Sequence, residues 1–372
     1  MYADYDLHLK LAQQLAAEGV IPVPHTLFQQ LTVAVRALIP FSWLQALPAR
    51  LRPDIASSQT YDAAAFVVYW LAFFATSVLV FRLFFAKISS SVNGTLRLVV
   101  SAIFTVALLV ASPVNLLTLH SHRLYLGYIG IATYHNPTVI LLKPLALGLF
   151  LAVEGSIRRE NAGARDVLLV AALSALGTMA KPSFALCFLP AMTLWLVYRT
   201  ATRRTGLAVS ARCLAAALVP SVIILVIQYL TQYGTDGADK VIWAPFQAIR
   251  LYVHPYPYVA AFYLLSILFP LLYALLFRTP PERDSGLSLA WLSFLAGSVL
   301  LYAFAESGRR FSHLNFAWSA QVALFVLFVV TAAKLLESGS LRVAANRVKT
   351  IACCAALSLH TASGVIWLFA NR

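Results

Sequence analysis

The chain has 372 residues, of which 60% are hydrophobic and only 11% are charged. This composition excludes a soluble globular protein, whose surface requires more charged side chains. The net charge is +14, but the lysines and arginines are spread between apolar runs instead of forming one basic patch. We therefore interpret them as signals of membrane topology and expect no nucleic-acid partner.

The first element of the chain is a short polar stretch at positions 4–8, which holds two aspartates and a histidine and opens a helical pattern. Asp4 and His8 are four residues apart, so they lie on one face of a helix. The simpler interpretation is a polar tail with a helix-capping aspartate. The alternative is a catalytic carboxylate, with Asp4 the first candidate and Asp6 the second, and His8 beside it as a substrate-binding group.

Residues 1–60 are amphipathic and are divided by prolines, and we predict that they form an extracytoplasmic loop domain. Within this domain, segment 26–47 has apolar residues at helical spacing with polar residues between them. This pattern predicts a helix that lies in the membrane interface.

Residues 61–372 form the second predicted domain, which is transmembrane. Its apolar runs are about 17 to 25 residues long, as a helix across a hydrocarbon core requires. The ten predicted spans are 62–85, 95–113, 137–155, 165–181, 183–199, 208–230, 257–277, 287–305, 316–336 and 349–369. The predicted fold class is all-α, a polytopic transmembrane helical bundle with amphipathic interfacial helices in its first extracytoplasmic loop.

Basic residues divide the loops into two sets. Sixteen lysines and arginines lie in the loops 82–97, 158–165, 199–212, 278–283 and 334–349, whereas the alternate short loops hold five. The positive-inside rule makes the first set cytoplasmic, so residues 1–60 lie outside the cytoplasm. Because an apolar segment would carry them across, we expect a further transmembrane helix before Asp4. All eight histidines lie on the outer side, namely His8, His25, His120, His122, His135, His254, His313 and His360.

Charged residues mark the outer ends of several spans. Glu306, Arg309, Arg310 and His313 stand close together after the eighth span. Arginine suits bidentate binding of phosphate, so we assign this run to substrate binding. The alternative is an interfacial anchor whose arginines reach toward lipid headgroups.

Two lysines are predicted near the same outer surface. Lys181 precedes Pro182, which breaks the helix and leaves backbone groups that are tolerated where they line a polar cavity. Lys181 is therefore a candidate second cation for a phosphate, although a lysine at the interface is the simpler interpretation. Lys143 lies inside the third span, and we expect it to reach toward the same outer cavity.

The loop 114–136 contains His122, Arg123 and His135, which we assign as substrate-contacting residues. His120 and His122 form a His-x-His pair that could bind a metal, but this signal is weak. We therefore assign no metal site and no cofactor, and a divalent metal is left as the alternative.

These residues combine carboxylates, cations and histidines on one face of a membrane-embedded body. Such a set suits a transfer in which a carboxylate takes the proton of an acceptor hydroxyl while cations hold a phosphate leaving group. A lipid-linked donor explains why the site is built in a membrane.

The acidic motif at 4–8, the turn 180–183, the stretch 134–138 and the run 306–316 resemble segments of the GT-C superfamily of polytopic glycosyltransferases. The resemblance implies a bacterial plasma-membrane enzyme with an extracytoplasmic active face, a polyprenyl-phosphate-sugar donor and a glycan or lipid acceptor. It also implies that Asp4 is the base, that Arg310 with Lys181 or Arg309 binds the departing phosphate, and that the anomeric centre is inverted.

Three other functions stay open on the sequence. An O-antigen-type polysaccharide polymerase or ligase shares the architecture but transfers an oligosaccharide. A transporter typically has internal repeats and polar residues near the midplane, and neither is evident here. A membrane partner subunit without catalytic activity is the third alternative.

Overall fold

The structure is a computed structural model, and it describes residues 3–21, 23, 25–38, 57–115, 127–131, 134, 136–233, 240–253, 258–278, 285–337 and 344–370. Its helices are α1 (Ala3–Glu18), α2 (Leu27–Leu38), α4 (Ser57–Lys87), α5 (Gly94–Val110), α6 (Pro137–Arg158), α7 (Ala164–Ala180), α8 (Ser183–Ala201), α9 (Leu207–Tyr233), α10 (Gln247–Arg250), α11 (Tyr258–Ser266), α12 (Leu268–Phe277), α13 (Ser285–Ala303), α14 (Ala317–Glu337) and α15 (Ala344–Ala370). A 3-10 helix, η2 (Gly308–His313), and two short strands, β1 (Val241–Trp243) and β2 (Phe304–Glu306), complete the described part.

Within these residues, seven helices are long and apolar enough to cross a membrane, or eight spans if α11 and α12 count as one. The seven are α4, α6, α8, α9, α13, α14 and α15, and each coincides with a predicted span. The prediction of an apolar helical bundle is therefore confirmed. The other three predicted spans fall on α5 and α7, which have 17 residues each, and on the bent pair α11 and α12.

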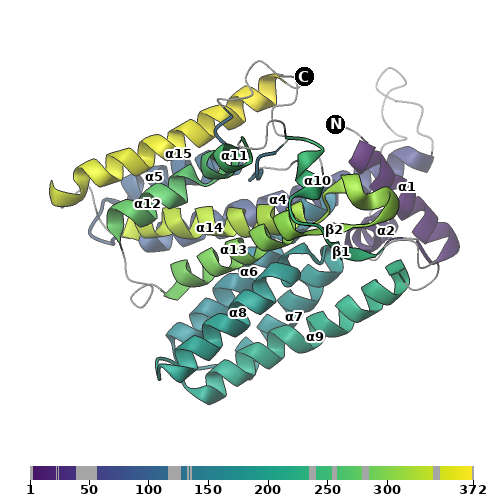
Figure 1. The fold of residues 1–372 in the computed structure, drawn as a ribbon, viewed down its shortest axis with the longest axis horizontal. Coiled ribbons are helices and arrows are strands. Elements are labelled where there is room, and N and C mark those ends of the chain that lie inside the picture. Colours follow the sequence, from purple (N-terminus) through teal and green to yellow (C-terminus); the bar gives the residue numbers. More distant parts are fainter. Residues whose placement is uncertain are drawn as a thin grey trace.

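Helix α14 runs through the middle of the bundle (Figure 1). It packs against α13, α8, α4, α6 and α12, and nearly all of its residues between Ser319 and Leu335 are buried. Such burial follows from a helix that is apolar on every side. The approach to α13 is especially close, because a Cβ atom at Gly297 would lie 2.9 Å from the Cα atom of Ala320. Small residues at this crossing allow the two backbones to approach.

The basic loops predicted to share one side meet at one end of the bundle. Lys87 at the end of α4 forms an ion pair of 3.0 Å with Glu337 at the end of α14. Arg212 near the start of α9 donates a hydrogen bond of 3.3 Å to the carbonyl of Ala162, just before α7. These contacts agree with the division of the loops that the charges predicted.

The seventh predicted span, 257–277, is not one straight helix. It breaks into α11 and α12, which are bent by 71° relative to each other. Pro270 follows the break, and it has no N–H to donate to the carbonyl of Ser266 and its ring would clash there in a continuous helix. Near the bend, the N–H of Phe269 donates to Nε2 of His360 at 3.4 Å.

A small sheet departs from the predicted all-α class. Strands β1 and β2 pair antiparallel, with Val241 opposite Glu306 and Trp243 opposite Phe304. The pairing continues past the strand ends, where Ser307 and Lys240 exchange two hydrogen bonds of 2.7 Å. The chain that leaves α13 is thereby held in place.

Helices α1 and α2 lie at the same end of the bundle as β1, β2 and α10 (Figure 1). They pack against each other and against α4, with Phe28 of α2 only 1% exposed. Of the predicted helix 26–47, the structure shows α2 up to Leu38, and positions 39–56 are outside the described residues. The polar N-terminal stretch is therefore anchored on the bundle through α2.

Candidate active site

Helix α1 presents Asp4 and His8 to the protein interior. They are one turn apart on the same face, and the His8 side chain is only 5% exposed while Asp4 is half-buried. Asp6 and Leu7 lie on the opposite, exposed face. The helical spacing thus directs one of the two candidate carboxylates inward and the other outward.

Asn136 joins α1 to α6. It is the N-cap of α6, where its Oδ1 atom accepts the N–H of Val139 at 3.2 Å and the hydroxyl of Thr138 at 2.6 Å. An asparagine followed by a proline at the first helical position is a standard way to begin a helix. Because the cap uses the amide oxygen, the amide nitrogen is available to Asp4, and it donates to Oδ2 of Asp4 at 3.3 Å.

Lys181 occupies the break between α7 and α8. Its backbone is extended, as expected for a residue before proline, and this ends α7. The side chain is 8% exposed, its Nζ donates to the hydroxyl of Thr138 at 3.4 Å, and the ammonium lies 4.8 Å from the ring centroid of Trp318. Burial lowers the pKa of Lys181 to about 8, and the electrostatic attraction of Asp4 opposes this shift.

These contacts form one polarised chain. Lys181 donates to Thr138, Thr138 donates to Asn136, and Asn136 donates to Asp4. Every donor therefore points from the cation toward the carboxylate. We call these four residues the Asp4–Lys181 chain.

Two uncharged histidines, His8 and His25, flank the Asp4–Lys181 chain. Burial, assisted by the nearby positive charge of Lys181, lowers the pKa of His8 to about 4, against an opposing effect of Asp4. Burial also lowers the pKa of His25 well below its usual value, and Lys181, His8 and Arg310 act in the same direction. The two rings lie 6.1 Å apart between centroids. At neutral pH both imidazoles are thus neutral.

Gln29 of α2 orients the ring of His8. With the amide nitrogen of Gln29 donating to the carbonyls of His25 and Thr26, its oxygen accepts from Nδ1 of His8 at 2.7 Å. The Nδ1 atom then carries the proton, so Nε2 of His8 has a lone pair for a hydrogen bond from a ligand.

The run after α13 supplies a second cation. Glu306 at the end of β2 is buried and pairs with Arg310 at 3.8 Å, and the amide of Asn315 also donates to Glu306. The Arg310 side chain is 30% exposed and close enough to His25 to influence its titration. Arg310 is therefore held near His25 by Glu306, with part of its side chain exposed.

The structure thus places Asp4, His8 and Lys181 together, and Arg310 with its partner Glu306 lies near His25. Asp6 is exposed on α1, and His313 is exposed on η2. The remaining predicted residues, His122, Arg123, His135 and the side chain of Arg309, lie outside the described residues. No group of three or more potential metal ligands occurs among the described His, Cys, Asp and Glu residues.

The sequence prediction missed several residues of this site. Asn136 and Thr138 entered the sequence prediction only as part of the stretch 134–138, which resembles segments of the GT-C superfamily. No role was predicted for His25, Gln29 or Trp318. Asn136 had a usable signal, because an Asn-Pro pair before an apolar run marks a helix start. The other residues reach the site only through packing between distant segments.

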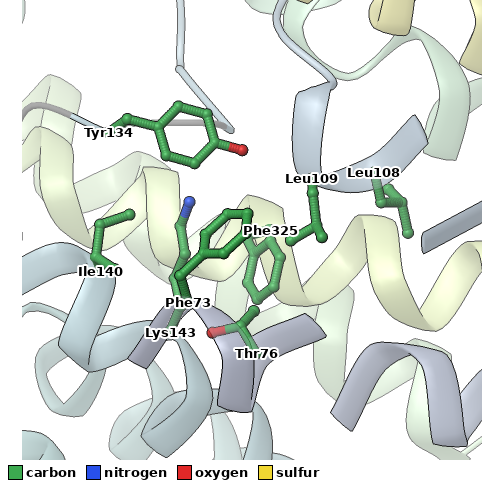
Figure 2. Close-up of a pocket in the computed structure, with 8 residues that line it drawn as sticks. All are labelled: Phe73, Thr76, Leu108, Leu109, Tyr134, Ile140, Lys143 and Phe325. Atoms are coloured by element: carbon green, nitrogen blue, oxygen red, sulfur yellow. The ribbon is translucent and has the colours of Figure 1, made fainter. Parts of the chain in front are cut away.

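Lys143 does not reach toward this site as predicted. It is buried beneath the ring of Tyr134, and its Nζ donates to the carbonyl of Ile131 at 3.0 Å. Figure 2 shows its ammonium pointing toward Tyr134, near Phe325 and Phe73. The ring centroids of Tyr134 and Phe325 are 5.5 and 5.2 Å away. The cavity here is about 10 Å³, roughly enough for one water.

Comparison with known proteins yields no relative of this chain: no family model, no curated protein and no solved structure matches it. Interpretation of the site therefore rests on its residues and their geometry.

Proposed function

We propose that this chain is a membrane glycosyltransferase that moves a sugar from a polyprenyl-phosphate-linked donor to an acceptor hydroxyl. The observation that carries the proposal is the Asp4–Lys181 chain, in which a proton acceptor and a buried cation from distant segments are joined by hydrogen bonds. In this proposal the arginine-rich end of the bundle is cytoplasmic, ten spans cross the membrane, and the site faces the extracytoplasmic side.

Asp4 is the proposed general base. The acceptor hydroxyl transfers its proton to the carboxylate of Asp4 while its oxygen attacks the anomeric carbon of the donor sugar. The bond between that carbon and the phosphate oxygen breaks, and the phosphate leaves with the bonding electrons. A single displacement of this kind inverts the anomeric centre. Asp6 is the weaker candidate because its side chain is exposed on the other face of α1.

The departing phosphate is held by cations in this mechanism. Lys181 supplies a buried ammonium, and Arg310 supplies a guanidinium positioned by Glu306. Charges that are fixed before the reaction stabilise developing negative charge most effectively. The neutral rings of His8 and His25 are suited to bind sugar hydroxyls, because uncharged imidazoles do not compete for the phosphate.

The same geometry suits a polymerase or ligase that transfers a lipid-linked oligosaccharide, and the donor that is consumed separates the two enzymes. Transport receives less support. The buried Lys143 donates to a backbone carbonyl, and the cavity beside it is much smaller than a sugar.

The test is a transfer assay in proteoliposomes containing the purified chain and a panel of radiolabelled polyprenyl-phosphate sugars, with release of polyprenyl phosphate as the readout. We expect Asp4→Asn to lower turnover by about a hundredfold or more, as is typical for loss of a general base. Asp6→Asn is the matched control, since it removes the same group from the exposed face of α1. It should leave turnover nearly unchanged.

Two results would contradict this assignment. If Asp6→Asn abolishes turnover and Asp4→Asn does not, Asp4 is not the base. If the wild type releases no polyprenyl phosphate from any donor while it folds and binds them, the glycosyltransferase proposal fails. Unchanged thermal unfolding of Asp4→Asn in detergent verifies that the variant is folded.

A further inference from the structure

A large groove lies between α8, α12 and α13, at the end of these helices opposite to the candidate active site. Its volume is about 610 Å³, within the range of small-molecule sites. It is lined by Leu194, Trp195, Tyr198, Arg199, Arg204, Ala274, Leu287, Ser288, Trp291, Leu292 and Leu295. Helix α8 begins beside Lys181, and its groove-lining residues, Leu194 to Arg199, lie about 17 to 24 Å further along the helix axis.

The walls of the groove are apolar and open to the surroundings of the bundle. Leu194 is 66% exposed and Leu295 is 47% exposed, whereas Trp195 is buried and forms the floor. On α13 the lining extends from Leu287 to Leu295, a length of about 12 Å along the helix. An elongated apolar slot that opens toward the bilayer fits a hydrocarbon chain.

Two arginines close one end of this apolar slot. Arg199 donates from Nε to the hydroxyl of Thr205 at 2.9 Å and from Nη2 to the carbonyl of Arg204 at 3.3 Å. The N–H of Arg204 in turn donates to the carbonyl of Arg199 at 2.8 Å. The guanidinium of Arg204 lies 5.6 Å from the ring centroid of Tyr198. Both cations are therefore positioned by the turn after α8.

The end of α8 and the turn after it carry three positive charges, on Arg199, Arg203 and Arg204, against two carboxylates that act on Arg199. Glu160 and Glu154 are close enough to Arg199 to interact with it, while Arg204 repels it. Two neighbouring guanidinium groups with an apolar slot beneath them form a site for one negative charge attached to a hydrocarbon tail. Arginine forms bidentate hydrogen bonds with phosphate, which matches this geometry.

We propose that the groove binds one anionic phospholipid from the leaflet at this end of the bundle. Its phosphate contacts Arg204 and Arg199, and one acyl chain lies along α13 between Trp291 and Leu295. The proposal is independent of the transfer reaction, because the donor lipid would react at the opposite end of α8.

The test measures quenching of tryptophan fluorescence by lipids with brominated acyl chains in detergent micelles, because Trp195 and Trp291 line the groove. We expect brominated phosphatidylglycerol to quench saturably and brominated phosphatidylcholine to bind about tenfold or more weakly. Trp291→Phe should remove a large part of the saturable quenching, which locates the acyl chain in the groove.

Arg204→Gln should weaken binding of phosphatidylglycerol by about tenfold, as expected for loss of a charge-assisted contact. Arg203→Gln is the matched control, since Arg203 is the exposed neighbour and does not line the groove. It should bind like the wild type, and an unchanged unfolding temperature verifies that Arg204→Gln is folded.

Three results would overturn the proposal. Equal binding of phosphatidylglycerol and phosphatidylcholine would remove the role of the arginines. An equal loss in Arg203→Gln and Arg204→Gln would indicate diffuse surface charge. Displacement of brominated phosphatidylglycerol at much lower concentrations of polyprenyl phosphate than of unlabelled phosphatidylglycerol would assign the groove to a different lipid.

Discussion

The burial of Lys181 makes a quantitative prediction about the pH dependence of stability. Lys181 is only 8% exposed, and its burial lowers its pKa in the folded chain from 10.5 to about 8 although the attraction of Asp4 opposes this shift. The informative perturbation is Lys181→Met, which keeps an unbranched side chain of similar length and removes the titrating group.

The sign of the effect follows from proton linkage. Between pH 8 and pH 10.5 the unfolded chain binds the proton of Lys181 and the folded chain has released it, so the free energy of unfolding rises with pH. A pKa difference of this size corresponds to about 3 kcal/mol in total, of which about 2 to 3 kcal/mol is gained between pH 7 and pH 10. Lys181→Met lacks this gain.

The assay is reversible unfolding of the purified chain by SDS in mixed micelles, carried out at pH 7 and pH 10. At each pH we take the difference in the free energy of unfolding between wild type and Lys181→Met. The change of this difference with pH reports Lys181, because other groups titrate equally in both proteins. Lys10→Met is the control, because Lys10 is exposed on α1, next to the site.

We expect the wild type to gain about 2 to 3 kcal/mol over Lys181→Met between the two pH values, and Lys10→Met shows the effect of removing a lysine elsewhere on α1. Parallel pH curves for wild type and Lys181→Met would refute the reasoning, since Lys181 would then titrate as an exposed lysine does. A gain of the opposite sign would mean that the attraction of Asp4 exceeds the cost of burial.

Two further predictions concern the architecture around the site. Asn136→Ala should lower the free energy of unfolding by about 1 kcal/mol through loss of the N-cap of α6. Asn136→Ser should retain most of this stabilisation, because serine is also a good N-cap. Equal losses for the two variants in calorimetry would exclude capping as the cause. Gly297→Ala should cost about 1 to 3 kcal/mol, because the new methyl group would overlap the backbone of Ala320. Gly206→Ala, where nothing lies within 4 Å, is its control, and equal unfolding temperatures for the two variants would contradict the close crossing of α13 and α14.

Features that depend on neighbours along the chain were predicted well from the sequence. The shared face of Asp4 and His8 follows from helical periodicity, and it is present on α1. The end of α7 at Lys181 follows from the following proline, and seven predicted spans follow from apolar length. The positions of basic residues also predicted which loops meet at one end of the helical bundle, as the ion pair between Lys87 and Glu337 illustrates.

Two details of the structure were not anticipated from local pattern. Segment 257–277 is apolar throughout, so hydropathy treats it as one span, but Pro270 removes a backbone donor and the helix bends. Lys143 was expected to reach the outer cavity, yet it finds an acceptor in the carbonyl of Ile131 instead. The nearest acceptor for a buried ammonium depends on the path of a neighbouring loop, which hydropathy does not describe.

The sequence by itself determined the class of the protein, the location of most helices and the types of residue available for chemistry, because these depend on composition and on short-range spacing. Only the tertiary structure decided that Asn136 and Thr138 link Asp4 to Lys181, that His25 joins them, and that Arg199 and Arg204 meet an apolar groove. Asp4 and Asn136 are 132 positions apart, so their contact arises from the packing of α1 and α2 against α4 and α6. No local pattern encodes such a contact, since it depends on how complete helix faces fit together.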